Sequence, residues 1–209
     1  MTALATREEG AVVPQAPHAA DTNTGVSNNK LGIWLFIASE SLFFGAFIAT
    51  YFLYRGRDAQ FMKGPTPSDV LNIPFTSVTT FMLLMSSLTM VLALAAIQRN
   101  DQRRFRVWIL ATALFGMAFI SGQVYEFTSF VKEGMGYTTN RSSSAFYTLT
   151  GFHGVHVTVG IVMLMSLFMM SLRGRLPQEK SEVVEIVGLY WHFVDVVWIL
   201  IFAVVYLIP

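Results

Sequence analysis

The chain has 209 residues, of which 54% are hydrophobic and only 13% are charged, and its formal net charge at pH 7 is +1. A soluble globular domain carries about 25% charged residues, so this composition indicates an integral membrane protein. The near-neutral charge does not point to nucleic acid as a partner, and the absence of cysteine excludes disulfides, zinc–thiolate sites, iron–sulfur clusters and c-type haem attachment.

Five stretches of the sequence are long and apolar enough to cross a bilayer, which takes about 20 residues of helix. None of them shows the period-2 alternation of barrel strands, so they predict an all-α integral membrane protein with a five-transmembrane-helix bundle. Residues 1–29, which are polar and contain two prolines, predict a mobile tail ahead of a membrane domain at 30–209. The predicted spans are 31–54, 76–97, 107–125, 145–172 and 183–208.

Lys and Arg residues are distributed unevenly between the two ends of the predicted bundle. Residues 1–30 and the connections at 98–106 and 173–182 share one end and carry nine of the 14 basic residues. The connections at 55–75 and 126–144 carry the other five. Because basic residues are retained on the cytoplasmic side, this distribution predicts a cytoplasmic N-terminus and a C-terminus outside.

Five ionisable side chains lie well inside the predicted spans: Glu40, His153, His156, His192 and Asp195. At about 1.5 Å per residue, each lies roughly 12–18 Å from the start of its span, near the middle of the membrane. A charge at this depth costs several kcal/mol unless it is paired. The two members of each i, i+3 pair, 153 with 156 and 192 with 195, share a helix face.

The spacing of these side chains leaves three interpretations open. The histidines and a carboxylate would bind a metal ion or a haem if they converge, which would make the chain a stand-alone redox protein. The same groups would instead link helices by hydrogen bonds, with Gly151 and Gly154 allowing close approach. Glu40 alone would serve as a proton relay. H-x-x-H is a weak motif, and the interpretation as helix packing is favoured.

Four short motifs follow one another along the chain: "SESLFFGAF" at 39–47, "GQVYEF" at 122–127, "GFHGVHV" at 151–157 and "YWHFVDVVWI" at 190–199. In this order they resemble subunit III of the haem-copper terminal oxidases, and Glu185 also matches the pattern. The chain is similar to the last five helices of longer seven-helix members, as short bacterial members are. The lipid cleft of those longer members would therefore need another subunit to supply its missing wall.

The resemblance implies a non-catalytic subunit of a bacterial respiratory oxidase that holds no catalytic residue, haem or metal of its own. The haems and copper are expected in subunits I and II, which reduce dioxygen to water and pump protons. The implied structural role, in helix packing or in contact with lipid or subunit I, falls on eight residues: Glu40, Gln123, Glu126, His153, His156, Glu185, His192 and Asp195.

The resemblance also implies the surroundings of the chain. Subunit I is the main expected partner, followed by subunit II, a small subunit IV where one is present, and bound phospholipid in the bacterial inner membrane. The implied effect is to stabilise subunit I over many turnovers. The short form occurs in both cytochrome c and quinol oxidases, and cytochrome c is the favoured donor.

Overall fold

The computed structural model describes residues 27–55, 65 and 71–207. Within these ranges it contains no strand and has five helices long and apolar enough to cross a membrane, which confirms the predicted fold class. They are α1 (Asn28–Arg55), α3 (Ile73–Gln98), α4 (Gln102–Lys132), α5 (Arg141–Leu172) and α6 (Ser181–Phe202). A 3₁₀ turn, η1 (Gln178–Lys180), precedes α6, and a π-helical turn, η2 (Ala203–Leu207), follows it.

The helices extend beyond the apolar stretches from which they were predicted. α4 begins at Gln102 and ends at Lys132, so it includes Arg106 and Glu126, which the predicted span of 107–125 leaves out. A helix of 31 residues is about 46 Å long and exceeds the hydrocarbon thickness of about 30 Å, so its polar ends reach the interfaces. α1 begins at Asn28, two residues inside the predicted tail, whose residues 1–26 lie outside the described part.

Three of the helices end in the same way. In α3, α4 and α5, the residue directly after the C-cap has a backbone in the left-handed region. The next backbone N–H then donates to a carbonyl five residues earlier, which satisfies one of the free carbonyls of the last turn. The left-handed residues are Asn100 (φ 59°), Gly134 (φ 89°) and Gly174 (φ 65°).

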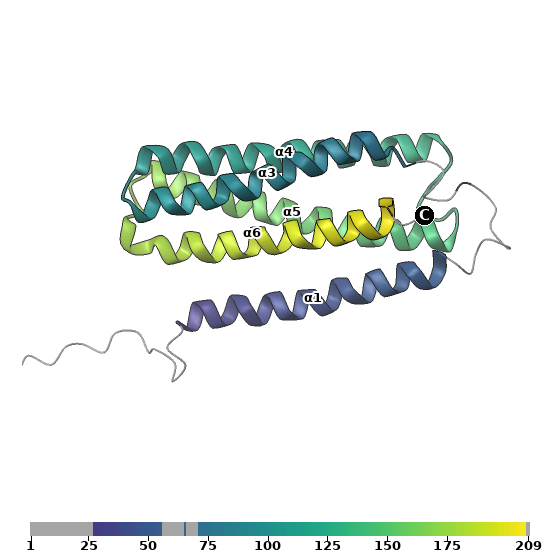
Figure 1. The fold of residues 1–209 in the computed structure, drawn as a ribbon, viewed down its shortest axis with the longest axis horizontal. Helices are drawn as coiled ribbons and strands as arrows, with labels where there is room; N and C mark the ends of the chain where they lie inside the picture. The colour runs from purple at the N-terminus through teal and green to yellow at the C-terminus, as the bar shows by residue number, and fades with distance from the viewer. Residues whose placement is uncertain (1–26, 56–64, 66–70, 208–209) are drawn as a thin grey trace, which may run out of the picture.

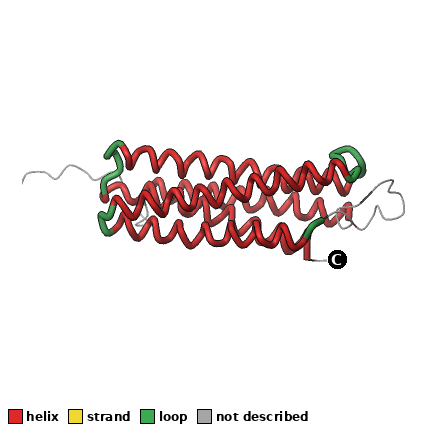
Figure 2. Tube along the Cα trace, turned by 90° about the horizontal axis from the view of Figure 1, so that it is seen from above, coloured by secondary structure: helices red, strands yellow, loops and turns green. Residues whose placement is uncertain are grey.

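The five helices lie side by side along one common direction, with their connections at the two ends (Figures 1 and 2). α3 packs against α4, and α4 packs against α5, while α6 contacts α3, α5 and α1. α1 lies at the edge of the bundle, on the other side of α6 from α3 and α4 (Figure 1). Only two of its side chains, Phe44 and Tyr51, are buried.

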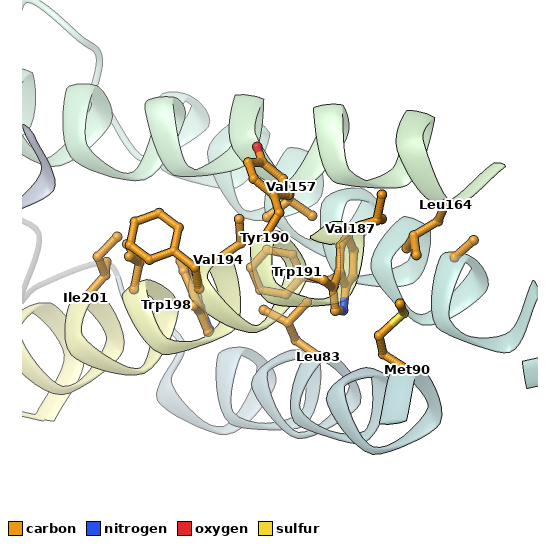
Figure 3. Packing of buried hydrophobic residues seen from close by; sticks show 14 of the residues in the cluster. Leu83, Met90, Val157, Leu164, Val187, Tyr190, Trp191, Val194, Trp198 and Ile201 are labelled. Atoms are coloured by element: carbon orange, nitrogen blue, oxygen red, sulfur yellow. The ribbon is translucent and has the colours of Figure 1, made fainter. Parts of the chain in front are cut away.

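Two tryptophans of α6 hold the centre of the bundle together. The indole N–H of Trp191 donates to Ser86 Oγ at 2.9 Å, and that of Trp198 donates to Thr80 Oγ1 at 2.9 Å, so both bind α3. Figure 3 shows the Trp191 ring among Leu83 and Met90 of α3 and Val157 of α5.

Glycines of two neighbouring helices make room for the ring of Trp191. A Cβ atom on Gly116 of α4 would lie 2.6 Å from the Trp191 ring, and one on Gly160 of α5 would lie 2.7 Å from it. No side chain fits at either position unless the indole moves, so the ring sets how closely the three helices approach.

Gly160→Val should therefore lower the melting temperature of the detergent-solubilised chain. Overpacking of a filled core costs about 1–3 kcal/mol, and the added methyl groups would collide with Trp191. Gly45→Val on α1 is the matched control, because no atom lies within 4 Å of a Cβ there. Equal melting temperatures for the two variants would show that the indole is free to move aside.

Candidate functional site

Glu40 of α1 and His156 of α5 form a pair in the middle of the bundle. Oε2 of Glu40 lies 3.3 Å from Nε2 of His156, and the two side chains are only 20% and 16% exposed. Nδ1 of His156 lies 2.8 Å from the carbonyl oxygen of Phe152, and because a carbonyl only accepts, Nδ1 carries a hydrogen. The ring is thereby oriented with Nε2 toward the carboxyl, and the contact between Nε2 and Oε2 joins α5 to α1.

The same region joins three helices. The hydroxyl of Tyr190 on α6 donates to the backbone carbonyl of His156 on α5 at 3.0 Å. Phe44, one of the two buried side chains of α1, places its ring edge-on to the His156 ring at a centroid distance of 5.0 Å. The carboxyl of Glu40 is therefore held at the junction of α1, α5 and α6.

His153 faces a different part of the bundle from His156, although the two are three residues apart. It is completely buried, with its ring stacked on Trp198 at 4.9 Å and edge-on to Phe119 at 5.9 Å. Its two ring nitrogens have no hydrogen-bond partner among the described residues. This histidine is packed between aromatic rings of α4 and α6.

His192 and Asp195 of α6 lie toward α3. Nδ1 of His192 lies 2.6 Å from Ser87 Oγ. The Asp195 carboxyl is 3% exposed and faces the same serine, yet neither of its oxygens makes a hydrogen bond of normal geometry within the described part of the chain. Ser87 of α3 is thus the polar neighbour of both side chains, and the described residues offer Asp195 no other hydrogen-bond partner.

The three histidines therefore point to three different places, namely α1, the aromatic interior and α3. Across residues 27–55, 65 and 71–207, no group of three or more His, Asp or Glu side chains is arranged to hold a metal ion. The metal and haem interpretations require these histidines to converge, and in the structure they point apart.

Gln123 and Glu126 both lie inside α4, and both are buried. Gln123 donates from Nε2 to the backbone carbonyl of Thr150 on α5 at 2.9 Å. Its Oε1 would lie 2.8 Å from a Cβ atom on Gly154. The absence of a side chain at Gly154 therefore leaves room for the amide of Gln123 against the α5 backbone. Glu126 accepts a hydrogen bond from Thr76 Oγ1 of α3. The two residues thus link α4 to the helices on either side of it.

Glu185 lies near the start of α6 and binds α1. Its Oε1 lies 2.9 Å from Nζ of Lys30, and one turn away Ser27 Oγ donates to Glu182 Oε1. These two contacts fix the beginning of α1 to the beginning of α6. The contact between Glu40 and His156 fixes the middle of α1 to α5.

Sequence reasoning missed the hydroxyl partners of these side chains. α3 carries buried or half-buried Thr and Ser residues along its length, and those at 76, 80, 86 and 87 contact Glu126, Trp198, Trp191 and His192. Hydroxyls that recur at helical spacing in an otherwise apolar span are a signal for interhelical hydrogen bonds. That signal was present in the sequence.

Comparisons with known proteins agree with this architecture. The sequence matches the family model for cytochrome c oxidase subunit III over residues 10–208. It is 37% identical over 194 residues to a cytochrome c oxidase subunit 3 from Bacillus sp. (strain PS3), covering 93% of this chain and 92% of that one.

Other relatives carry both oxidase names. Identity is 37% over 181 residues to a cytochrome c oxidase subunit 3 from Alkalihalophilus pseudofirmus, covering 86% of each chain. It is also 37% over 181 residues to a probable quinol oxidase subunit 3 from Staphylococcus saprophyticus, covering 86% of this chain and 89% of that one. The chain belongs to the cytochrome c oxidase subunit III family of the haem-copper oxidases, whose members associate with other oxidase subunits.

Proposed function

We propose that this chain is a non-catalytic subunit of a bacterial aerobic respiratory oxidase and acts by stabilising the catalytic subunit. The observation that carries the proposal is the use of its buried polar groups. Glu40, Gln123 and Glu126 each bind a neighbouring helix of the same chain, so these groups support packing. The haems and copper that reduce dioxygen, and the proton pump, are assigned to subunits I and II.

The edge position of α1 supports subunit I as the main partner. One side of this helix contacts α5 and α6, and the other exposes large apolar side chains that include Trp34, Leu35 and Leu42. We propose that subunit I covers part of this outer side, with subunit II, a small subunit IV where present, and membrane lipid around the rest. The contact between Glu40 and His156 would then keep α1 in the position that subunit I requires.

We place the complex in the bacterial inner membrane. Its proposed electron donor is cytochrome c. Relatives of equal identity are named as cytochrome c oxidase and as probable quinol oxidase subunits, so the sequence similarity supports both donors equally. Cytochrome c remains the favoured donor, and this choice applies to the complex, because the donor site lies on other subunits.

Affinity purification through this chain in a mild detergent tests the proposal. Haem-containing subunits should co-elute, show haem bands in the reduced-minus-oxidised spectrum, and oxidise reduced cytochrome c faster than quinol. The chain stripped of its partners should show neither a haem band nor copper. A haem signal kept by the pure chain would make its histidines ligands, and a preference for quinol would overturn the assignment of the donor.

Removal of the Glu40–His156 pair should shorten the working life of the oxidase without lowering its initial rate. Oxidases carrying Glu40→Ala or His156→Ala should keep normal haem content and lose activity several-fold faster in sustained turnover, because α1 loses its central contact. The double variant should resemble the worse single one, since residues in contact are coupled by about 0.5–3 kcal/mol.

Thr50→Ala is the control for these variants, because its hydroxyl on the same helix donates to the carbonyl of Ala46 and to no other described residue. It should behave as wild type in both initial rate and lifetime. A loss of rate or of proton pumping from the first turnover in Glu40→Ala would instead assign Glu40 to proton transfer.

The proposed orientation places the N-terminus in the cytoplasm. Because the chain has no cysteine, single cysteines report the side of the membrane without background from this subunit. Thr138→Cys, between α4 and α5, should react with a membrane-impermeant maleimide on intact cells. Gln98→Cys, at the end of α3, should react only after lysis, and the opposite pattern would invert the orientation.

A further inference from the structure

A groove of about 670 Å³ opens where α3 ends and α4 begins. Away from the connection, along the two helices, its wall is apolar and includes Leu92 and Ala96 of α3 and Val107 of α4. Its rim, at the connection between the helices, carries three arginines, Arg99, Arg103 and Arg104. This volume lies in the range of about 300–1,000 Å³ that is common for small-molecule sites.

Two of the three arginines have no partner within the described residues. Arg104 pairs with Asp101 at 3.2 Å, and the same aspartate accepts from the backbone N–H of Arg104 and caps α4. The guanidinium groups of Arg99 and Arg103 make no hydrogen bond or ion pair to the described part of the chain. The groove therefore presents two free positive charges, and its single carboxylate is already used.

The depth of the groove matches the boundary of a membrane. Leu92 lies six residues before the end of α3 at Gln98, which corresponds to about 9 Å along the helix axis. Trp108, which also lines the groove, lies six residues after the start of α4 and is half-buried. Tryptophan favours the level of the lipid headgroups, so the arginines lie at headgroup level and the apolar wall begins at the acyl chains.

We propose that this groove binds one anionic phospholipid, with its phosphate between Arg99 and Arg103 and an acyl chain along the apolar wall. A free phosphate ion would satisfy the arginines but would leave the apolar wall uncovered. Basic residues often flank a membrane span without a groove beside them. Here Arg99 and Arg103 line the rim of an apolar groove. The inference gives a place and a chemical class to the lipid binding expected of the proposed function.

This groove is separate from the cleft that the resemblance implies beside the missing helices. That cleft would border α1, whereas the groove lies between α3 and α4, on the other side of α6 (Figure 1). Lipid in this groove would therefore not depend on another subunit to complete a wall.

The test uses the intact oxidase in nanodiscs of phosphatidylcholine that contain a small fraction of photoactivatable phosphatidylglycerol. Labelling should map to the peptide that contains Val107 and Trp108. The Arg99→Gln, Arg103→Gln variant should lower that labelling about 30-fold, because each basic residue near an anionic headgroup contributes to binding. Lys180→Gln is the control, since Lys180 is an exposed basic residue at the same end of the bundle that does not line the groove.

Leu92→Trp serves as a second variant, which fills the groove and keeps both arginines. It should also reduce labelling, and full labelling in either groove variant would overturn the proposal. Equal labelling by photoactivatable phosphatidylcholine would remove the requirement for an anionic headgroup. Labelling abolished by a millimolar excess of inorganic phosphate would assign the groove to free anions.

Assembly of each preparation is checked by its haem spectrum and its turnover with reduced cytochrome c. An assembled, active complex without selective labelling would overturn the lipid site and leave the proposed function standing. Failure of the wild-type chain to co-purify with haem-containing subunits would overturn the proposed function itself.

Discussion

The packing of Trp191 between α3, α4 and α5 is the contact on which the rest of the bundle depends. In a bilayer, lipid chains are as apolar as leucine side chains, so helices associate through close packing and hydrogen bonds and not through removal of apolar surface from water. Trp191 supplies both, because it packs directly over Gly116 and Gly160 and donates to Ser86. α6 is thereby held against three helices, and it presents its other side to α1.

The polar side chains follow from this arrangement. A buried polar group in a membrane must find its partner within the protein, and most of those described here do so across a helix boundary. Glu126 uses Thr76, Gln123 uses the backbone of α5, and His192 uses Ser87. Asp195 and His153 differ, since the described residues offer them no hydrogen-bond partner. These two side chains are buried, but they do not link helices by hydrogen bonds as the other polar groups do.

The number and type of helices could be predicted from sequence because five apolar stretches of sufficient length leave few alternatives. The helix ends could not, because polar residues such as Arg106 and Glu126 continue a helix into the interface, where no apolar pattern marks them. The eight candidate site residues were named from the motifs, and their role stays a prediction, whereas the hydroxyl partners on α3 were not named.

The partners of those residues depend on rotations that spacing does not resolve. His153 and His156 are offset by about 60° around α5, and that angle suffices to send one into the aromatic interior and the other to Glu40. The fit of Trp191 over two glycines, 31 and 75 residues away in sequence, is likewise a property of tertiary structure. No local pattern carries that information.

The pairing of Glu40 with His156 also sets an order of events during synthesis. The two residues are 116 positions apart, which the ribosome covers in about 6–23 s at roughly 5–20 residues per second. During that interval the first helix is in the membrane with its carboxyl unpaired, and its later neighbours α5 and α6 do not yet exist. α1 can therefore dock only once α5 has been made, and a nascent chain that stops after α4 lacks the two helices that α1 mainly contacts.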